Sequence, residues 1–323
     1  MTTKQKLLEI LEANRGYPIS GENLASRLSV SRSAIWKTIK SLQQDGYMIN
    51  ASTNIGYTLD EKSNILSVEG IKQFLNDDKT TIIVEDIIDS TNIYAKNIAE
   101  KGAAHGSIVI ANQQTQGKGR LGRKFSSPPD SGIYISIILR NVKALNSISL
   151  ITSGVSVAVC KAIEIISGKS LQIKWVNDLY KGGKKCGGIL CEGSTDFETG
   201  MFEYIVVGIG INLYEPKGGF EQDISDIATY IFEENEIISR CRLAATIVNE
   251  VMKIVDDFPN KSFMDYYHKN NIIIGKEINV TETNAQYLAK AIDITNEGHL
   301  LIQLQDKRIK ELICGEVSIK LNQ

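Results

Sequence analysis

A short glycine-rich basic loop restricts the fold of this chain more than any other stretch. Residues 117–125 hold three glycines and four cations: Gly117, Lys118, Gly119, Arg120, Gly122, Arg123 and Lys124. Glycine permits positive φ and close approach of the backbone to a ligand, and neighbouring cations repel one another until an anion binds. We therefore expect a phosphate clamp that becomes ordered when its ligand is present.

Two other interpretations of this loop stay open at this point. The spacing Gly117-x-Gly119-x-x-Gly122 matches the dinucleotide-binding fingerprint, which opens a helix directly after a strand. Here two prolines and the strand-like run 133–139 follow instead, so the context does not fit. The second alternative is a solvated basic surface loop.

Length and charge limit the classes of protein. A chain of 323 residues with 42% hydrophobic and 23% charged residues is typical of a soluble protein with two or three domains. The net charge of −2 excludes a uniformly basic nucleic-acid coat, so any DNA contact needs a local patch. We see no apolar run that approaches a membrane span or a signal segment, and we expect a cytoplasmic protein without membrane contact.

Cysteine and histidine usage indicates neither a disulfide framework nor a metal site. The five cysteines are odd in number and scattered, and Cys186 and Cys191 lack a second pair for zinc. The three histidines are isolated from one another. We expect no metal bound by the chain's own side chains.

The first sixty residues predict a winged helix-turn-helix. Helices are expected over 4–13, from Ser20 through Leu28, and from a Ser31 cap to Gln44. Strands at 47–50 and 55–59, around a turn at 51–54, form the wing. The outer face of the third helix carries the expected DNA-binding residues Arg32, Ser33, Trp36, Lys37 and Lys40. In this motif the last helix enters the major groove; a three-helix interaction module is the alternative.

Strands dominate after the polar run 60–64, which we interpret as a linker. Strands are expected at 80–84, 107–110, 133–139, 171–175, 185–192 and 204–207, with helices at 68–75, 90–99, 150–166 and 240–268. Short strands near 276–280, 286–293, 300–303 and 317–319, with a hairpin turn at 295–298, indicate a small β-barrel. The prediction is an α+β multidomain chain with domains at 1–62, 63–270 and 271–323.

Four further motifs can bind a polar ligand. Residues 89–92 (DSTN) place hydroxyls at a helix N-terminus, and residues 174–178 (KWVND) end a strand with an amide and a carboxylate. Residues 185–190 place a lysine before a glycine pair, and residues 208–212 form another close-approach loop. Trp175 could be a core residue or a ligand stacker.

Together with the winged helix, these motifs resemble the bifunctional biotin–protein ligase and biotin operon repressor family over essentially the whole chain. They fall in the family's order and approximate spacing: 31–37, 89–92, 117–123, 174–178, 185–190, 208–212 and 315–319. Three residues depart from the family's pattern, namely Lys118 for Arg, Phe125 for Trp and Val176 for Pro. Phe125 offers less stacking area than Trp and no N–H.

The resemblance implies a biotin/lipoate ligase-like central domain, an SH3-like C-terminal barrel and two activities. The first is attachment of biotin to a lysine of the carrier domains of biotin-dependent carboxylases, through biotinyl-5′-AMP made from ATP with Mg²⁺. The second is repression of biotin synthesis and transport genes by an adenylate-bound homodimer on operator DNA.

The resemblance also implies roles for individual residues. Arg120, Lys185 and Asp178 would be catalytic, although Asp178 taken alone is more typical of a strand-end cap than of a catalytic group. Biotin would contact Ser90, Thr91, Asn92, Gln114, Gly117, Arg120, Lys185, Gly188 and Gly210. ATP and the adenylate would contact Lys118, Arg120, Arg123, Lys124, Phe125, Asn177 and Asn212.

Two functions from other classes remain as alternatives. A repressor could sense biotin without ligase activity, but it would not need the lysine-orienting carboxylate of Asp178. A lipoate ligase shares the general fold, and the winged helix and the loop 117–123 argue against it.

Overall fold

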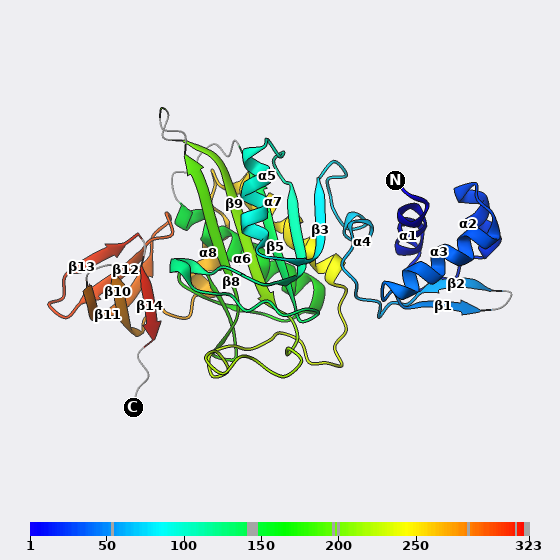
Figure 1. The fold of residues 1–323 in the computed structure, drawn as a ribbon. Helices are drawn as coiled ribbons and strands as arrows, with labels where there is room; N and C mark the ends of the chain where they lie inside the picture. The colour runs from blue at the N-terminus through cyan, green and yellow to red at the C-terminus, as the bar shows by residue number, and fades with distance from the viewer. Residues whose placement is uncertain are drawn as a thin grey trace. The chain divides into compact units, whose positions relative to one another are not determined.

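The computed structural model describes residues 1–52, 55–140, 148–195, 198, 201–282, 285–313 and 315–319. The chain divides into two compact units. Figure 1 shows the elements of the chain in order from the N-terminus to the C-terminus. The first contains Met1–Lys79 and Asn235–Asn249, and the second contains Thr80–Glu234 and Glu250–Gln323.

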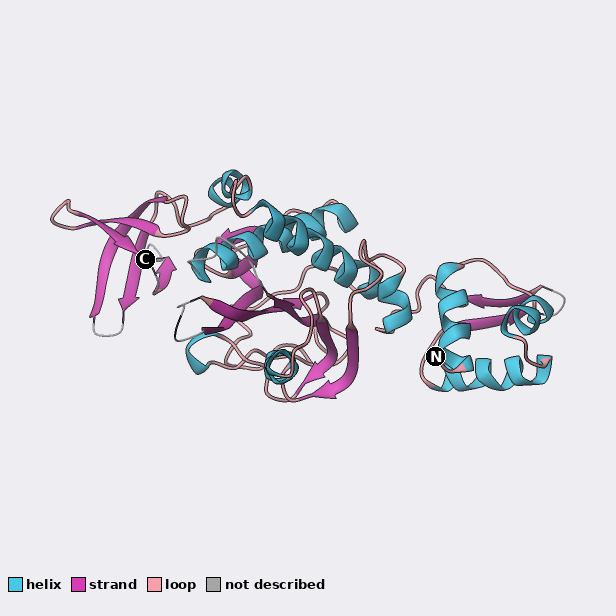
Figure 2. Cartoon of the chain, turned by 90° about the horizontal axis from the view of Figure 1, so that it is seen from above, coloured by secondary structure: helices cyan, strands magenta, loops and turns pink. Residues whose placement is uncertain are grey.

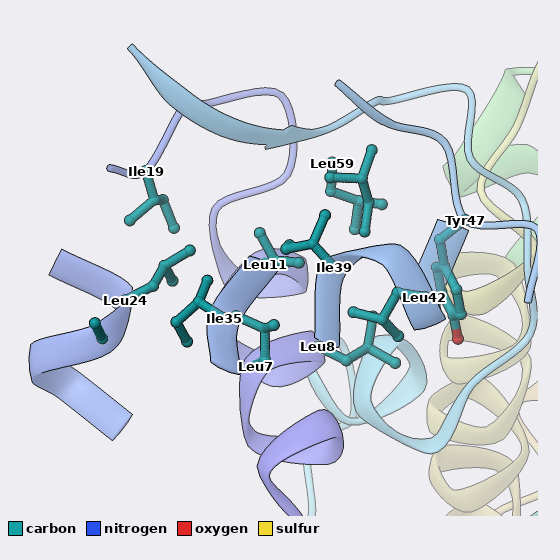
Figure 3. Close-up of a cluster of buried hydrophobic side chains, with 12 residues drawn as sticks. Leu7, Leu8, Leu11, Ile19, Leu24, Ile35, Ile39, Leu42, Tyr47 and Leu59 are labelled. Carbon is teal, nitrogen blue, oxygen red and sulfur yellow. The ribbon is translucent and has the colours of Figure 1, made fainter. Parts of the chain in front are cut away.

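The first unit begins with a winged helix-turn-helix, as predicted. Its elements are α1 (Thr3–Ala13), α2 (Gly21–Leu28), α3 (Arg32–Gln44), β1 (Ile49–Ser52) and β2 (Gly56–Leu59). The hydroxyls of Thr2, Ser20 and Ser31 cap the three helices by accepting hydrogen bonds from first-turn N–H groups. Apolar side chains from the helices and the hairpin close one core (Figure 3). Thr53 and Asn54 of the predicted turn lie outside the described residues.

Residues that follow the wing and the beginning of α7 (Arg240–Asp257) complete the first unit. α1 packs against α4 (Val68–Lys72). Arg15 Nη1 donates to the carbonyl of Ser63 at 2.6 Å, and the N–H of Arg240 donates to Asn64 Oδ1 at 2.8 Å. The stretch interpreted as a linker is therefore held by hydrogen bonds within this unit.

The second unit is built on a seven-stranded sheet in the order β3-β4-β5-β9-β8-β7-β6. Its strands are β3 (Ile82–Ile88), β4 (Ile108–Gln114), β5 (Gly132–Leu139), β6 (Gln172–Lys174), β7 (Asp178–Lys181), β8 (Lys184–Thr195) and β9 (Phe202–Asn212). β3 and β4 pair in parallel, and the other neighbours pair antiparallel. β5 is buried along its whole length and forms the centre of the core.

Helices cover both faces of this sheet (Figure 2). α5 (Thr91–Glu100) packs against β4, β5 and β9, while α6 (Ile148–Ser167) packs against β7 and β8 and carries α8 (Phe263–Lys269). The expectation that no segment reaches the length of a membrane span is wrong for α6, which is long and apolar enough. However, 72% of its most apolar window is buried inside the protein, so α6 is a core helix here.

A five-stranded antiparallel sheet follows, in the order β13-β12-β11-β10-β14. Its strands are β10 (Glu277–Glu282), β11 (Ala285–Ile294), β12 (Leu300–Leu304), β13 (Ile309–Leu312) and β14 (Glu316–Ile319). The predicted hairpin turn is present, since the N–H of Thr295 donates to the carbonyl of His299 at 2.8 Å and Gly298 has a φ of 80°. The sheet agrees with the expected SH3-like barrel.

Three local predictions are corrected by the structure. The motif 174–178 does not end a strand: residues 175–177 form a turn, and Asp178 begins β7. β13 was missed because four residues give too short an apolar pattern. The single helix expected over 240–268 is two helices, and Pro259, which lacks an N–H, lies in the break.

Candidate active site

A polar cavity of about 400 Å³ lies in the second unit. Its wall combines the N-terminus of α5, the end of β4, the basic loop, the turn between β6 and β7, strands β8 and β9, and residues around β14. A cavity of this volume is large enough for a small-molecule ligand.

Most of the predicted site residues line this cavity. They are Ser90, Thr91, Asn92, Gln114, Lys118, Arg120, Arg123, Lys124, Phe125, Asn177, Asp178, Lys185, Gly188 and Gly210. Gly117 and Asn212 are not part of the lining. Asn212 Nδ2 instead donates to the carbonyl of Thr229 at 3.1 Å, which holds the segment after β9.

The basic loop is folded on itself. The N–H of Gly119 donates to the carbonyl of Arg123 at 2.7 Å, and the N–H of Phe125 donates to the carbonyl of Gly117 at 2.9 Å. A Cβ at Gly117 would lie 2.4 Å from the Phe125 carbonyl oxygen, so this position requires glycine. Leu121, in the 3₁₀ turn η1 (Arg120–Gly122), has a φ of 55°. Gly117 therefore shapes the loop.

Two loop arginines are hydrogen-bonded to other parts of the second unit. Arg120 Nη1 donates to Asn177 Oδ1 at 3.1 Å, and Arg120 Nη2 donates to the carbonyl of Gly315 at 3.2 Å. Arg123 Nη2 donates to Glu316 Oε2 at 2.6 Å. These contacts connect the basic loop to the β6–β7 turn and to the beginning of β14.

An ion pair joins β7 and β8 on the cavity wall. Lys185 Nζ lies 2.5 Å from Asp178 Oδ1, and Asp178 is the register partner of Gly188. Burial lowers the pKa of Lys174, and repulsion by Lys185 adds to this shift while attraction to Asp178 opposes it. The Asp178 carboxylate, at the beginning of β7, therefore attracts two lysines, Lys174 and Lys185.

Two glycines of β9 let side chains lie directly on the sheet. A Cβ at Gly208 would lie 2.1 Å from Asn92 Oδ1, and a Cβ at Gly210 would lie 2.5 Å from Phe125 Cε1. The Phe125 ring also meets Tyr134 edge-on, with 6.4 Å between ring centroids. The Phe125 ring therefore forms an aromatic part of the cavity wall and lies directly on the backbone of β9 at Gly210.

Hydroxyl and amide groups gather at the N-terminus of α5. Thr91 donates from its N–H and from its hydroxyl to Gln114 Oε1, at 2.9 and 3.1 Å. Ser90 precedes the helix and is 1% exposed, and its hydroxyl makes no capping hydrogen bond. No described residue is hydrogen-bonded to that hydroxyl, so it is available to a ligand in the cavity.

A second candidate site lies on α3 of the first unit. All five predicted DNA-binding residues are exposed, and Trp36 is 52% exposed. Within the described part of the chain, Arg32, Lys37 and Lys40 form no ion pair. Unpaired cations around an exposed tryptophan on the third helix suit contact with nucleic acid.

Comparison with known proteins identifies the family. Family models match the chain as an HTH domain at residues 3–58, the biotin/lipoate A/B protein ligase family at 84–212 and the biotin protein ligase C terminal domain at 273–320. The bifunctional ligase/repressor BirA of Bacillus spizizenii is 31% identical over 98% of this chain and 99% of its own length. The chain belongs to the bifunctional biotin–protein ligase and biotin repressor family.

Two further similarities agree with membership of this ligase/repressor family. The bifunctional ligase/repressor BirA of Escherichia coli is 29% identical over 99% of this chain and 98% of its own length. A solved structure, the biotin protein ligase from Aquifex aeolicus in complex with biotin and ATP, is 26% identical and has a TM-score of 0.63. It covers 75% of this chain and 99% of the solved chain.

Sequence reasoning left Trp175 open between a core residue and a ligand stacker, and gave no role to Lys174 and Glu316 in the site of this family member. Trp175 is 3% exposed and its Nε1 donates to the carbonyl of Gly298 at 2.9 Å, so it is a core residue that connects to the barrel. Lys174 and Glu316 also line the cavity. Both lie in motifs that carried the family resemblance, and position in those motifs was the signal that could have found them.

Proposed function

We propose that this chain joins biotin to a lysine of a carrier-protein domain through biotinyl-5′-AMP, and that its adenylate-bound form represses biotin synthesis and transport genes. Biotin ligation with ATP and repression are the activities of the family to which the chain belongs. The proposal is carried by one observation: the basic loop and the Lys185–Asp178 ion pair face the same cavity.

We assign the biotin end of the cavity to the N-terminus of α5. The free hydroxyl of Ser90 supports this assignment, because the fused urea ring of biotin carries both hydrogen-bond donors and an acceptor. Thr91, Asn92 and Gln114 complete the polar wall, and Gly188 and Gly210 offer backbone. Gly117 acts on biotin indirectly, through the shape of the loop.

We assign the nucleotide end to the other part of the basic loop. Lys118, Arg123 and Lys124 contact phosphate, Asn177 lies beside them, and Phe125 provides an apolar face for adenine. Asn212 supports this region through the Thr229 carbonyl. The cavity carboxylates Asp178 and Glu316 are each paired with a cation, so Mg²⁺ would arrive with the triphosphate and be held mainly by its oxygens.

In the first half-reaction a biotin carboxylate oxygen attacks the α-phosphorus of ATP, and the bond to pyrophosphate breaks. Carboxylate and triphosphate repel one another, so the step needs positive charge between them. Arg120 and Lys185 are the cations that we assign to this place. Arg120 is already oriented by Asn177 and Gly315, which lowers the cost of ordering it.

In the second half-reaction the amine of the carrier lysine attacks the acyl carbon and AMP leaves. The amine must lose a proton, and we assign its orientation and deprotonation to Asp178. Asp178→Asn should therefore form adenylate at nearly the wild-type rate but transfer biotin roughly 100-fold more slowly. Single-turnover release of pyrophosphate, measured separately from transfer to the carrier, distinguishes the steps; equal slowing of both would contradict this role.

The DNA-binding part of the proposal rests on α3. We assign Arg32, Ser33, Trp36, Lys37 and Lys40 to operator contact, and an adenylate-bound homodimer to binding of a two-fold site. We retain residues 1–62, 63–270 and 271–323 as the proposed domains. The cytoplasm, where ATP, carrier proteins and DNA are together, is the proposed location.

Purified protein incubated with labelled biotin, MgATP and a carrier domain tests the function directly. We expect biotin-dependent pyrophosphate exchange without the carrier, and label on one carrier lysine when the carrier is present. Adenylate formation without transfer would favour a sensor without ligase activity. Labelling by lipoate in preference to biotin would favour a lipoate ligase.

A further inference from the structure

A line of hydrogen bonds continues from the biotin end of the cavity to an ion pair outside it. Asn92 Nδ2 donates to Glu192 Oε2 at 2.8 Å, and Glu192 Oε1 lies 2.5 Å from Lys96 Nζ. On the other side of Asn92, the hydroxyl of Ser136 is 2.6 Å from Asn92 Oδ1 and 2.8 Å from Thr91 Oγ1. The line therefore joins a charged pair on α5 and β8 to a cavity hydroxyl.

The acceptor at the end of this line fixes the orientation of Asn92. A carboxylate can only accept, so Asn92 turns its NH₂ group towards Glu192 and its oxygen towards Ser136; the Leu190 carbonyl, a weaker acceptor at 3.4 Å, lies on the same side. Burial works to raise the pKa of Glu192, but hydrogen bonds from Lys96 and Asn92 lower it below the ordinary value. Glu192 is therefore ionised at neutral pH and holds this orientation.

The orientation of Asn92 in turn decides where the Ser136 hydrogen goes. Ser136 is fully buried, and its single hydroxyl hydrogen can serve Asn92 Oδ1 or Thr91 Oγ1. With an oxygen of Asn92 at the shorter distance, that hydrogen goes to Asn92. The hydroxyl hydrogen of Thr91 then lies between Ser136 Oγ, at 2.8 Å, and Gln114 Oε1, at 3.1 Å, so no hydrogen from Ser136 occupies the lone pairs of Thr91 that face the cavity.

We propose that Glu192 is a positioning residue for the biotin end of the site, because it keeps Thr91 an acceptor for a ligand N–H group. This inference rests on the proposed function, since the urea ring of biotin supplies the N–H donors. With a neutral amide in place of Glu192, Asn92 can rotate its amide by 180° and turn NH₂ towards Ser136. The Ser136 hydroxyl then donates to Thr91 Oγ1 and competes with the ligand N–H group for the lone pairs of that oxygen.

The test compares Glu192→Gln with the wild type in biotin-dependent pyrophosphate exchange. We expect the KM for biotin to rise about tenfold, the worth of one hydrogen bond, while kcat at saturating biotin and the KM for ATP change less than about twofold. Glu203→Gln on neighbouring β9 is the matched control, because Glu203 is exposed and pairs with Ser194. It should behave as wild type.

A double-mutant cycle separates positioning from general damage. Ser136→Ala removes the competing hydrogen, so in that background Glu192→Gln should leave the KM for biotin unchanged. An unchanged KM in the single variant, additive effects in the cycle, or equal rises in the KM for biotin and ATP with a lower melting temperature would each overturn the proposal. Failure of the wild type to form biotinyl-adenylate would instead overturn the proposed function.

Discussion

Arg120 illustrates how much of this site depends on one side chain. Its guanidinium contacts Asn177 and the carbonyl of Gly315 and lines the cavity, where we propose that it lies between biotin and ATP. Charge-assisted hydrogen bonds to a planar guanidinium are stronger and more directional than neutral ones. Loss of this side chain removes a cation from the intermediate and two tethers from the loop.

We predict that Arg120→Gly keeps the fold but releases biotinyl-adenylate roughly 10- to 100-fold faster, since a hydrogen bond to a charged group is worth about 1.5–3 kcal/mol. The escaping adenylate should label bystander lysines. Retention of labelled adenylate after rapid gel filtration measures the release. Arg123→Gln is the control with a smaller expected effect, because its side chain is 68% exposed; wild-type retention by Arg120→Gly would refute the assignment.

Single residues show what the sequence could and could not predict. Motif residues such as Gly117, Arg120 and Lys185 were found because glycine and cations at fixed spacing are unusual. The close approach of the Phe125 carbonyl to Gly117, eight residues away, is visible only in the fold. Glu192 was not found at all, because its contacts come from residues about one hundred positions earlier. Contacts between a helix and a strand so far apart in the sequence leave no local pattern.

At the scale of elements, α3 carries the clearest prediction for DNA. Lys37 and Arg32 are exposed and lack ion pairs among the described residues, so each is free to neutralise one phosphate. Lys37→Ala should weaken operator binding and reduce the slope of log affinity against log salt by about one. Titrations at several salt concentrations measure the slope. Lys72→Ala, on α4, should leave it unchanged, and an unchanged slope for Lys37→Ala would place that lysine off the phosphates.

The connection after the wing changes the expected result of a deletion. Ile65 packs against the winged-helix core, Cys241 Sγ donates to the carbonyl of Ile65 at 3.3 Å, and α1 packs on α4. Removal of residues 1–62 should abolish operator binding. It should also lower the melting temperature by roughly 5 °C or more, because apolar surface on α4 becomes exposed. Calorimetry measures the melting temperature, and a turnover assay of the same variant measures ligase activity. An unchanged melting temperature would show that residues 60–64 are a simple linker.

At the scale of the whole molecule, the order of parts was predictable and their contacts were not. A winged helix, a mixed sheet and a barrel each have a local pattern of periodicity and turns. The tethers from Arg120 and Arg123 to residues 315 and 316 join positions almost two hundred residues apart. The sequence offered the loop and the C-terminal motif separately, and only the fold brings them together.

Leu121 is the basis of a prediction about assembly. It is 76% exposed in the turn η1, so it does not pack into its own domain in the described structure. It borders an apolar hollow that also includes Ile148, Phe202 and Ile313. An exposed leucine beside an apolar hollow on the same surface can be self-complementary, as a two-fold contact requires.

We predict that biotinyl-adenylate promotes dimerisation through this surface and that Leu121→Asp prevents it, because a carboxylate would be desolvated at the contact. A coupling of about 1–3 kcal/mol between adenylate and dimer is enough to change operator occupancy several-fold. Sedimentation of wild type and variant, each with and without adenylate, measures the coupling. Ile165→Asp, at an apolar position on α6 that is 58% exposed, controls for an added surface charge and should dimerise as wild type. Equal ligand-linked dimerisation by Leu121→Asp would assign the interface to another surface and leave the ligase proposal intact.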